Sequence, residues 1–288
     1  MDFETIFKNF RCDTSDKMHR IYQLLKPLLI DRLVNFLLLN RQSPAGRPIK
    51  TDFDRLFDAI YFIIESGSQT KYVSHFGISK TTYKRYLDIL VNNQIIETVY
   101  FDLINQQLEK HDPVPLITDT FSVKSMRGSK GLGRNPTDRG RKGLKVSLIC
   151  DLDRITTGFH IESCNRHDSK CLLPTLEHMK PRHQQIDCLC DAGYVGKKLK
   201  KQCENLCYHL IVKPKKNSNL SMTHTLTDME KNHLHKFRNR IELLNQNIRR
   251  YRSLMIKWVQ SINVYRCFLC VVLFSCVHSC LFWCVKSS

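Results

Sequence analysis

The stretch Pro115-Leu-Ile-Thr-Asp-Thr-Phe-Ser-Val-Lys124 decides the fold of this chain, because it has the residues of a strand with one carboxylate at its centre. Leucine, isoleucine, phenylalanine and valine in a short apolar run favour β structure. Asp119 interrupts that run. The stretch therefore predicts a strand that carries a candidate site residue.

Two later segments also place a carboxylate in an ordered element. Ile186-Asp-Cys-Leu-Cys-Asp-Ala-Gly-Tyr194 predicts a second strand, with Asp191 at its carboxyl end before a glycine turn. In Phe237-Arg-Asn-Arg-Ile-Glu-Leu-Leu-Asn-Gln-Asn-Ile-Arg-Arg250 the apolar residues recur at helical spacing, so Glu242 lies beside the apolar stripe of a helix. From there Glu242 can reach over the sheet edge toward the two aspartates.

Three carboxylates on two strands and a helix are typical of a site for phosphoryl transfer with two metal ions. Mg²⁺ and Mn²⁺ prefer oxygen ligands, and two ions about 3.5–4 Å apart stabilise the attacking and leaving oxygens of an in-line displacement. A single carboxylate is usually a solvated or paired surface group. The order and setting of all three predict that Asp119, Asp191 and Glu242 are both the catalytic residues and the metal ligands.

The amino-acid sequence around these carboxylates resembles that of the DDE transposases of bacterial insertion sequences, in the broad group that includes insertion sequences four and five. The resembling segments are Ile117-Thr-Asp-Thr120, Cys190-Asp-Ala-Gly-Tyr-Val-Gly196 and Arg238-Asn-Arg-Ile-Glu242, followed by Arg249 and Arg250. In that family the last block carries a Tyr, an Arg, the catalytic Glu and a Lys or Arg at fixed spacing. Arg238, Glu242 and Arg249 match it here. His235 stands at the position of the Tyr.

The resemblance covers roughly residues 115–270 and implies a ribonuclease-H-like fold of the α/β class, a mixed sheet with flanking helices. It also implies that the chain cuts and transfers DNA strands with two Mg²⁺ or Mn²⁺ ions. The local patterns agree, because strands followed by alternating helices and strands predict a mixed α/β sheet. Besides the strand of Asp191, given as residues 187–191, the further predicted strands are residues 144–150, 155–163 and 208–213, and the predicted helices are residues 168–179 and 197–205.

The charge of the chain points to a polyanion as its partner. With 288 residues the chain can form one or two domains, and its formal net charge is +18. So large a basic excess is typical of proteins that bind nucleic acid or an anionic membrane, although basic residues also serve solubility. We expect DNA, both element ends and target, with a homo-oligomer assembled on it.

A basic, glycine-rich segment follows the first predicted strand, between Lys124 and Lys145. Because such a segment buries little apolar surface, it predicts a mobile loop near the site whose counter-charge is DNA phosphate. The alternative is a solvated hairpin that contacts nothing. The residues of this segment that we expect to bind DNA are Arg139, Arg141, Lys142 and Lys145.

Basic residues also flank Glu242 on its helix. Arg238 and Arg249 are expected to hold the DNA backbone and to fix the scissile phosphate. For the other arginines of this helix, a solvated face is the preferred interpretation.

The region before residue 110 predicts helices in a helix-turn-helix layout near residues 52–93. Ser79 is placed to cap the third helix, whose Tyr83, Leu87 and Leu90 face inward at helical spacing. A small helical bundle without a DNA-binding role would show the same pattern. The outward residues of this helix that we expect to bind DNA are Lys80, Thr81, Lys84 and Arg85.

These patterns predict three parts: a helical DNA-binding region over residues 1–110, a catalytic domain over residues 111–266 and an apolar, cysteine-rich tail over residues 267–288. The tail is uncharged from Cys267 to Val285, which is just long enough to cross a bilayer, so a membrane span is one alternative. A histidine, two serines and many cysteines weaken that alternative and favour a buried or aggregation-prone tail.

Two further groups of residues stay outside the predicted site. The thirteen cysteines are expected to be free thiols, since their number is odd and no secretory signal opens the chain. Cys203, Cys207 and His209 lack a fourth ligand for zinc. His167 and Asp168 are left out of the catalytic set, because such a pair also caps a helix.

Three functions remain open. The preferred one is a metal-dependent transposase that cuts and joins DNA at the ends of a mobile element. The second is a nuclease with the same metals and no strand transfer, and the third is a DNA-binding protein derived from an inactive transposase, to which His235 and the tail point. We expect a cytoplasmic, nucleoid-associated protein in a bacterium or a nuclear protein in a eukaryote.

Overall fold

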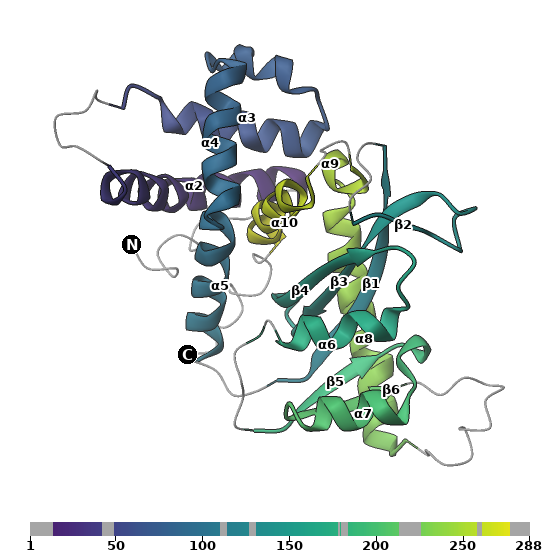
Figure 1. Cartoon of the computed structure of the whole chain (residues 1–288). Coiled ribbons are helices and arrows are strands. Elements are labelled where there is room, and N and C mark those ends of the chain that lie inside the picture. The colour runs from purple at the N-terminus through teal and green to yellow at the C-terminus, as the bar shows by residue number, and fades with distance from the viewer. Residues whose placement is uncertain are drawn as a thin grey trace. The chain divides into compact units, whose positions relative to one another are not determined.

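The structure, a computed structural model, describes residues 14–41, 49–109, 114–126, 131–177, 179, 184–212, 226–257 and 261–276 (Figure 1). Its contacts divide the chain into two compact units. One consists of Met1–Leu103 with Ile248–Ser288, and the other of Ile104–Asn247. The first unit is helical, and the second contains the sheet.

The second unit is built on one mixed sheet. Its strands are β1 (Leu116–Ser125), β2 (Gly133–Arg134), β3 (Lys142–Cys150), β4 (Thr156–Ser163), β5 (Ile186–Cys190) and β6 (Tyr208–Val212). Their order is β2-β3-β1-β5-β6, and β4 pairs with β3 (Figure 1). β1 runs antiparallel to β3 and parallel to β5, and β5 runs parallel to β6. This arrangement confirms the predicted mixed α/β class.

β1 is a central strand, and its first half is buried between two neighbours. Ile117 pairs with Cys150 on β3 and with Leu189 on β5. Apolar residues on both faces suit a strand that is covered on both sides. Farther along β1, exposed and buried residues alternate while β3 remains its partner. Asp119 therefore lies where β1 emerges from the covered part of the sheet.

A tight turn at residues 151–154 joins β3 to β4 as a hairpin. Asp151 is buried in this turn, and its Oδ1 accepts hydrogen bonds from the backbone N–H groups of Asp153 at 2.9 Å and Ile155 at 2.8 Å. Arg154 takes a left-handed backbone conformation with φ 69°. The buried carboxyl group thus closes the turn from inside.

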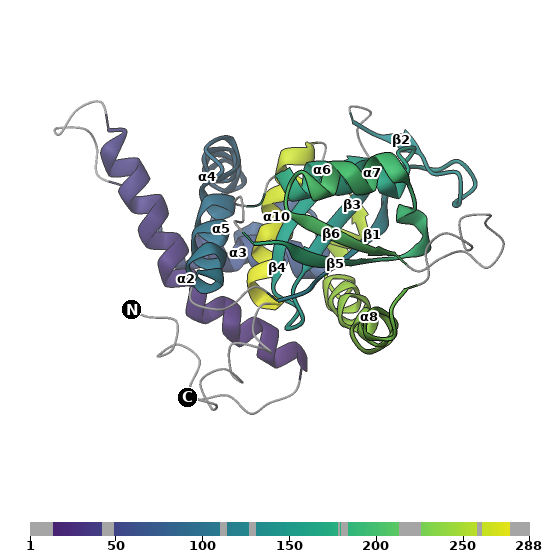
Figure 2. The same ribbon diagram turned by 90° about the horizontal axis from the view of Figure 1, so that it is seen from below.

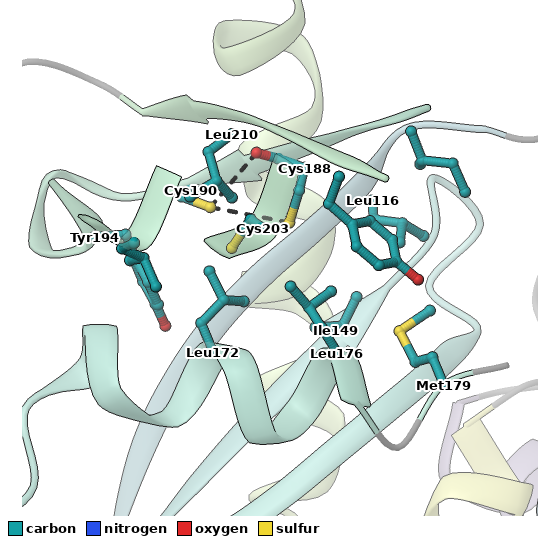
Figure 3. Close-up of a cluster of buried hydrophobic side chains, with 13 residues drawn as sticks. Leu116, Ile149, Leu172, Leu176, Met179, Cys188, Cys190, Tyr194, Cys203 and Leu210 are labelled. Atoms are coloured by element: carbon teal, nitrogen blue, oxygen red, sulfur yellow. Dashed lines mark hydrogen bonds between the residues drawn. The ribbon is translucent and has the colours of Figure 1, made fainter. Parts of the chain in front are cut away.

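Helices cover both faces of the sheet. α6 (Asp168–Glu177) and α7 (Lys197–Glu204) lie on one face, and α8 (Asp228–Ile248) lies on the other (Figure 2). The core under α6 and α7 is apolar and rich in thiols (Figure 3). Its labelled members are Leu116, Ile149, Leu172, Leu176, Met179, Cys188, Cys190, Tyr194, Cys203 and Leu210.

The predicted strands and helices of this unit are present, and their ends differ from the prediction by one or two residues. The exception is the helix of Glu242, which begins at Asp228 instead of near residue 237. Thr227 and Glu230 explain the earlier start, because Glu230 N–H donates to Thr227 Oγ1 and Thr227 N–H donates to Glu230 Oε2. This reciprocal pair is a capping box.

The first unit contains most of the remaining elements, which come from residues before and after the sheet in the sequence. They are α2 (Thr14–Leu39), α3 (Phe53–Ser66), η1 (Thr70–Phe76), α4 (Lys80–Asn92), α5 (Ile95–Leu108), α9 (Arg252–Met255), β7 (Ile256–Lys257) and α10 (Ile262–Cys276). α5 crosses the boundary between the two units at Leu103. The predicted helical region before the sheet is therefore confirmed.

The helical pieces of the predicted helix-turn-helix stand where the sequence places them, as α3, η1 and α4. Ser79 Oγ accepts from Thr82 N–H at 3.1 Å and so caps α4. Gly77 ends η1 in the left-handed conformation, with φ 71°. Tyr83, Leu87 and Leu90 are buried, as predicted. The DNA-binding role of this part stays a prediction.

α10 (Ile262–Cys276) spans the predicted boundary at residue 266. The helix begins at Ile262 and packs against α2, α4 and α9, so the boundary falls inside a helix of the first unit. Arg266 forms an ion pair with Glu97 on α5 at 2.5 Å, and the residues from Cys267 to Cys276 are buried. The described residues of the predicted tail pack on α2 and α4, which are far away in the sequence, and on α9, which directly precedes them. Residues 277–288 of the predicted tail lie outside the described part.

Membrane spanning was the other interpretation of the tail. Among the helices that the structure describes, none combines the length and apolar character needed to cross a bilayer.

Candidate active site

The register of the sheet brings Asp119 and Asp191 to corresponding positions on neighbouring strands. β1 pairs in parallel with β5 at Ile117 and Leu189. Asp119 follows Ile117 by two residues, and Asp191 follows Leu189 by two. Because side chains alternate between the two faces of a sheet, both carboxylates lie on the same face as Ile117 and Leu189.

Arg238 connects Asp191 with Glu242. Its Nη2 lies 3.5 Å from Asp191 Oδ2, and its Nε lies 3.5 Å from Glu242 Oε1. Arg238 and Glu242 are four residues apart on α8, which places them on one face of the helix. The guanidinium therefore stands between two of the three predicted carboxylates.

Asp119 is the most enclosed of the three. Its Oδ1 accepts from Thr120 N–H at 2.8 Å, and its Oδ2 accepts from Asn245 Nδ2 at 2.9 Å. Burial raises its pKa to about 6, the charges of Asp191 and Asp168 add to that rise, and the Thr120 N–H and Arg238 oppose it. A negative charge at Asp119 is thus costly unless a cation accompanies it.

Asp168, which the sequence prediction left out, lies beside this group. Its Oδ1 accepts from Thr120 Oγ1 at 2.9 Å and pairs with Lys145 Nζ at 2.6 Å. Lys145 also donates to Arg166 O at 2.6 Å. Thr120 follows Asp119 directly in the sequence, and its N–H group donates to Asp119, so it connects Asp168 and Lys145 with Asp119. In the sequence, the one signal for Asp168 as a site residue is its position within the part of the chain that resembles the family.

His167 has the capping role that the sequence suggested. Its Nδ1 lies 2.8 Å from Ser169 Oγ and accepts from Ser169 N–H at 3.3 Å, at the start of α6. The helix-capping interpretation therefore fits His167, while Asp168 is turned toward Thr120 and Lys145.

Asn245 is a second residue that the sequence prediction missed. It lies three residues after Glu242 on α8 and is only 6% exposed. Its Nδ2 donates to Asp119, while its Oδ1 is buried with no hydrogen-bond partner among the described residues. A polar residue at the border of the apolar stripe was the signal in the sequence.

The donor set suits a hard divalent cation. Among the described residues no three His, Cys, Asp or Glu side chains are arranged to hold one ion. Arg238 lies 3.5 Å from both Asp191 and Glu242. Carboxylate oxygens are nevertheless the ligands that Mg²⁺ and Mn²⁺ prefer. The unpartnered Asn245 Oδ1 adds a polar atom beside Asp119. By the chemistry of their donor atoms the residues therefore fit such an ion.

The structure brings two of the predicted DNA-binding residues to the carboxylates and leaves the others elsewhere. Arg238 and Lys145 are at the site, the latter through Asp168. Arg249 is exposed directly after the end of α8. The remaining ones are exposed, in the first turns of α4 and before or at the start of β3: Lys80, Thr81, Lys84, Arg85, Arg139, Arg141 and Lys142.

The described part of the predicted mobile loop is a hydrogen-bonded turn at the tip of β2 and β3. Asn135 N–H donates to Arg141 O at 2.9 Å, and Gly140 N–H donates to Asn135 O at 2.9 Å. Arg139 and Gly140 both take left-handed conformations, with φ 50° and 70°. Lys142 and Lys145 belong to β3. Residues 127–130 of the predicted loop lie outside the described part.

The cysteines of this unit serve packing. Cys188, Cys190 and Cys203 are buried in the core under α6 and α7, where Cys190 Sγ lies 3.9 Å from Cys188 Sγ (Figure 3). Burial raises the pKa of the Cys203 thiol to about 12. His209 lies 3.1 Å from Asp187, on the neighbouring strand. The described cysteines are free thiols.

Comparisons with known proteins identify a family. Residues 110–274 match the family model described as Transposase DDE domain. No curated protein matches the chain.

Two solved structures are similar at low identity. The piggyBac transposase synaptic complex with hairpin DNA is 9% identical, with a TM-score of 0.48, over 91% of this chain and 73% of that chain. The Mos1 mariner paired end complex with Mn is 10% identical, with a TM-score of 0.25, over 88% of this chain and 87% of that chain. At these TM-scores neither likeness carries a functional conclusion, which rests on the family match.

Proposed function

This chain belongs to the transposase DDE domain family and is therefore an enzyme that acts on DNA in transposition, and we propose that it cuts the ends of a mobile element and joins them to target DNA. The residues that match the family include Asp119, Asp191 and Glu242. One observation carries the proposal. Three segments far apart in the sequence converge, since β1 and β5 align the two aspartates and Arg238 ties Glu242 to Asp191.

We assign these three carboxylates as ligands of Mg²⁺ or Mn²⁺, two ions for one site. When bound, the ions supply positive charge to the attacking and leaving oxygens of the displacement. Asp119 is held at both oxygens by Thr120 and Asn245, so its carboxylate plane is fixed before an ion arrives. Asp191 and Glu242 are half exposed, and Asp191 Oδ1 accepts from Ala192 N–H at 2.7 Å.

The reaction that we propose needs no covalent enzyme intermediate. A water oxygen forms a bond to phosphorus, the bond from that phosphorus to the 3′ oxygen breaks, and a 3′-hydroxyl and a 5′-phosphate result. The 3′ oxygen then attacks a target phosphate and displaces the 3′ oxygen of the target strand. Arg238 and Arg249 would orient the phosphates, because a guanidinium can hold two phosphate oxygens at once.

The spacing of Arg238, Glu242 and Arg249 supports a place in the group of insertion sequences four and five, with His235 in place of a Tyr. In the structure His235 is exposed on α8, three residues before Arg238 and on the same face of the helix. We propose that His235 faces the DNA as the Tyr of that group does.

Recognition of the element ends is assigned to the helical part before the sheet. The first turns of α4 expose Lys80, Thr81, Lys84 and Arg85, while its opposite face is buried. Helices of this kind read DNA with the residues of their first turns. Each chain carries one set of three site carboxylates, whereas a mobile element has two ends. We therefore propose that a homo-oligomer assembles on DNA.

Replacing the carboxylates one at a time tests the proposal. Asp119→Ala, Asp191→Ala and Glu242→Ala should abolish nicking of DNA that carries the element ends, in Mg²⁺ and in Mn²⁺, and should leave DNA binding nearly intact. Asp187→Ala on β5 and Asp228→Ala on α8 are matched controls, since each removes a carboxylate from the same part of the fold away from the site, and Asp228 is exposed and pairs with Lys231. Both controls should nick as the parent does.

A variant of the three that nicks DNA at the parental rate would remove that residue from the site. If the parent itself does not nick DNA in either metal, the chain is an inactive DNA-binding relative.

A further inference from the structure

Asn245 is a buried polar residue on an otherwise apolar face of α8. Its neighbours one turn away on that face, Ile241 and Ile248, are buried, and Asn245 itself is 6% exposed. The amide makes one hydrogen bond, from Nδ2 to Asp119 Oδ2 at 2.9 Å. Its Oδ1 is buried without a partner among the described residues.

Packing alone does not explain an asparagine at this position. A buried acceptor without a hydrogen bond destabilises the fold, whereas a leucine of similar volume would be favourable on this face. The half-satisfied amide therefore points to a role that its packing does not show. That role must involve Asp119, the group that Asn245 contacts.

The orientation of the amide follows from the chemistry of its partner. An ionised carboxylate accepts hydrogen bonds and cannot donate them, so the NH₂ group must face Asp119 and the carbonyl oxygen must face away. Thr120 N–H holds Asp119 Oδ1, and Asn245 Nδ2 holds Oδ2. Each carboxylate oxygen keeps lone-pair capacity for a cation after these bonds form.

We propose that Asn245 is a positioning residue that fixes the carboxylate of Asp119 for divalent-cation binding, with its Oδ1 accepting a hydrogen bond from water that enters with the hydrated ion. This inference rests on the proposed function, because it takes Asp119 as a ligand. Residues that orient a ligand in this way typically contribute roughly 10- to 100-fold in metal affinity or activity.

The test measures Mn²⁺ binding to the full-length protein by electron paramagnetic resonance of the free ion, without DNA. Asn245→Leu should raise the Kd for Mn²⁺ about tenfold or more relative to the parent. Asn232→Leu is the matched control, since Asn232 is an exposed asparagine on the same helix, and it should leave the Kd unchanged. Thermal unfolding of each variant is recorded in parallel.

A double-mutant cycle separates positioning from a general effect on the fold. If Asn245 acts through Asp119, then Asn245→Leu should weaken Mn²⁺ binding by the parent, and it should not weaken further the binding that remains in an Asp119→Ala background. Asn245→Leu should also leave the Tm without metal unchanged or higher, because it removes the unpartnered oxygen. Asn245→Asp offers a second variant that keeps the size of the side chain and replaces the donor by an acceptor, and it should unfix Asp119 in the same assay.

The outcomes distinguish this inference from the function on which it rests. Mn²⁺ binding that is lost in Asp119→Ala and retained within twofold in Asn245→Leu would overturn the positioning role alone. A lower Tm with unchanged Mn²⁺ affinity in both Asn245 variants would do the same and would leave a structural role. Equal Mn²⁺ binding by the parent and Asp119→Ala would overturn the proposed site and this inference together.

Discussion

Asp151 gives the sheet unit a pH-dependent stability that its turn geometry makes measurable. The residue is 5% exposed, and burial raises its pKa to about 7, with the neighbouring charge of Asp153 adding to the rise. Its Oδ1 accepts two backbone N–H groups, which opposes the rise. Asp151→Asn keeps an oxygen for both N–H groups and removes the charge, so it isolates the cost of that charge.

The direction in which stability changes with pH depends on how many protons the folded and unfolded states bind. An aspartate whose pKa is higher in the folded than in the unfolded state stabilises the fold at low pH and loses that contribution as pH rises from about 3.9 to about 7. A pKa difference of about three corresponds to about 4 kcal/mol at most. Between pH 5 and pH 8 we therefore expect the free energy of unfolding of the parent to fall, relative to Asp151→Asn, by up to about 3 kcal/mol.

Urea unfolding of both proteins at several pH values between 5 and 8 measures this difference. Asp153→Asn is a graded control, because loss of the neighbouring charge should lower the pKa of Asp151 and end the decline of stability at a lower pH. Identical pH dependence in the parent and Asp151→Asn would refute the reasoning. It would show that the two N–H groups fully offset the effect of burial on the pKa of Asp151.

Three further predictions concern the charged groups. Arg238→Gln should lower the Kd for Mn²⁺, since the guanidinium no longer competes for Asp191 and Glu242, and should slow nicking; a higher Kd would show that Arg238 holds the carboxylates together. The slope of log affinity against log salt should flatten by as much as about two to three when the basic turn loses Arg139, Arg141 and Lys142 to glutamine, and an unchanged slope would mean no phosphate contact. Changing both Lys84 and Arg85 to alanine in the full chain should lower the preference for element ends over random DNA, measured by competition at fixed salt. An unaltered preference would remove the recognition role of α4.

The full chain is the right material for the last of these experiments. α10, at the far end of the sequence, packs against α2 and α4, and Arg266 pairs with Glu97. A fragment that ends at residue 110 would lack these contacts and expose the face that α10 covers. Stability and DNA binding would then change together.

The carboxylate pair could be predicted from sequence because its signals are local. Asp119 and Asp191 each accompany a short apolar run, and such runs form neighbouring strands in a mixed sheet. The helix of Glu242 was likewise visible in its apolar period. In contrast, the reciprocal cap of Thr227 and Glu230 lies before the apolar stripe begins, so the predicted helix started too late.

The parts that could not be predicted depend on contacts across the fold. Asn245 reads as one more polar residue of a helix until the structure places its amide against Asp119. Asp168 looked like a cap, and only the approach of Thr120 and Lys145 shows its actual partners. The residues after Cys267 are apolar in composition, and α2 and α4, two of the helices against which α10 packs, are more than a hundred residues away. Composition does not encode partners of that kind.

Strand transfer by pre-cut ends tests the central claim most directly. Labelled element ends with a free 3′-hydroxyl are incubated with the full-length protein, target DNA and Mg²⁺ or Mn²⁺, and covalently joined products are measured. We predict joined products with the parent protein, and none with ends that lack the 3′-hydroxyl or with Asp119→Ala. Nicking of intact ends without any joining of pre-cut ends would contradict the account and leave a metal-dependent nuclease.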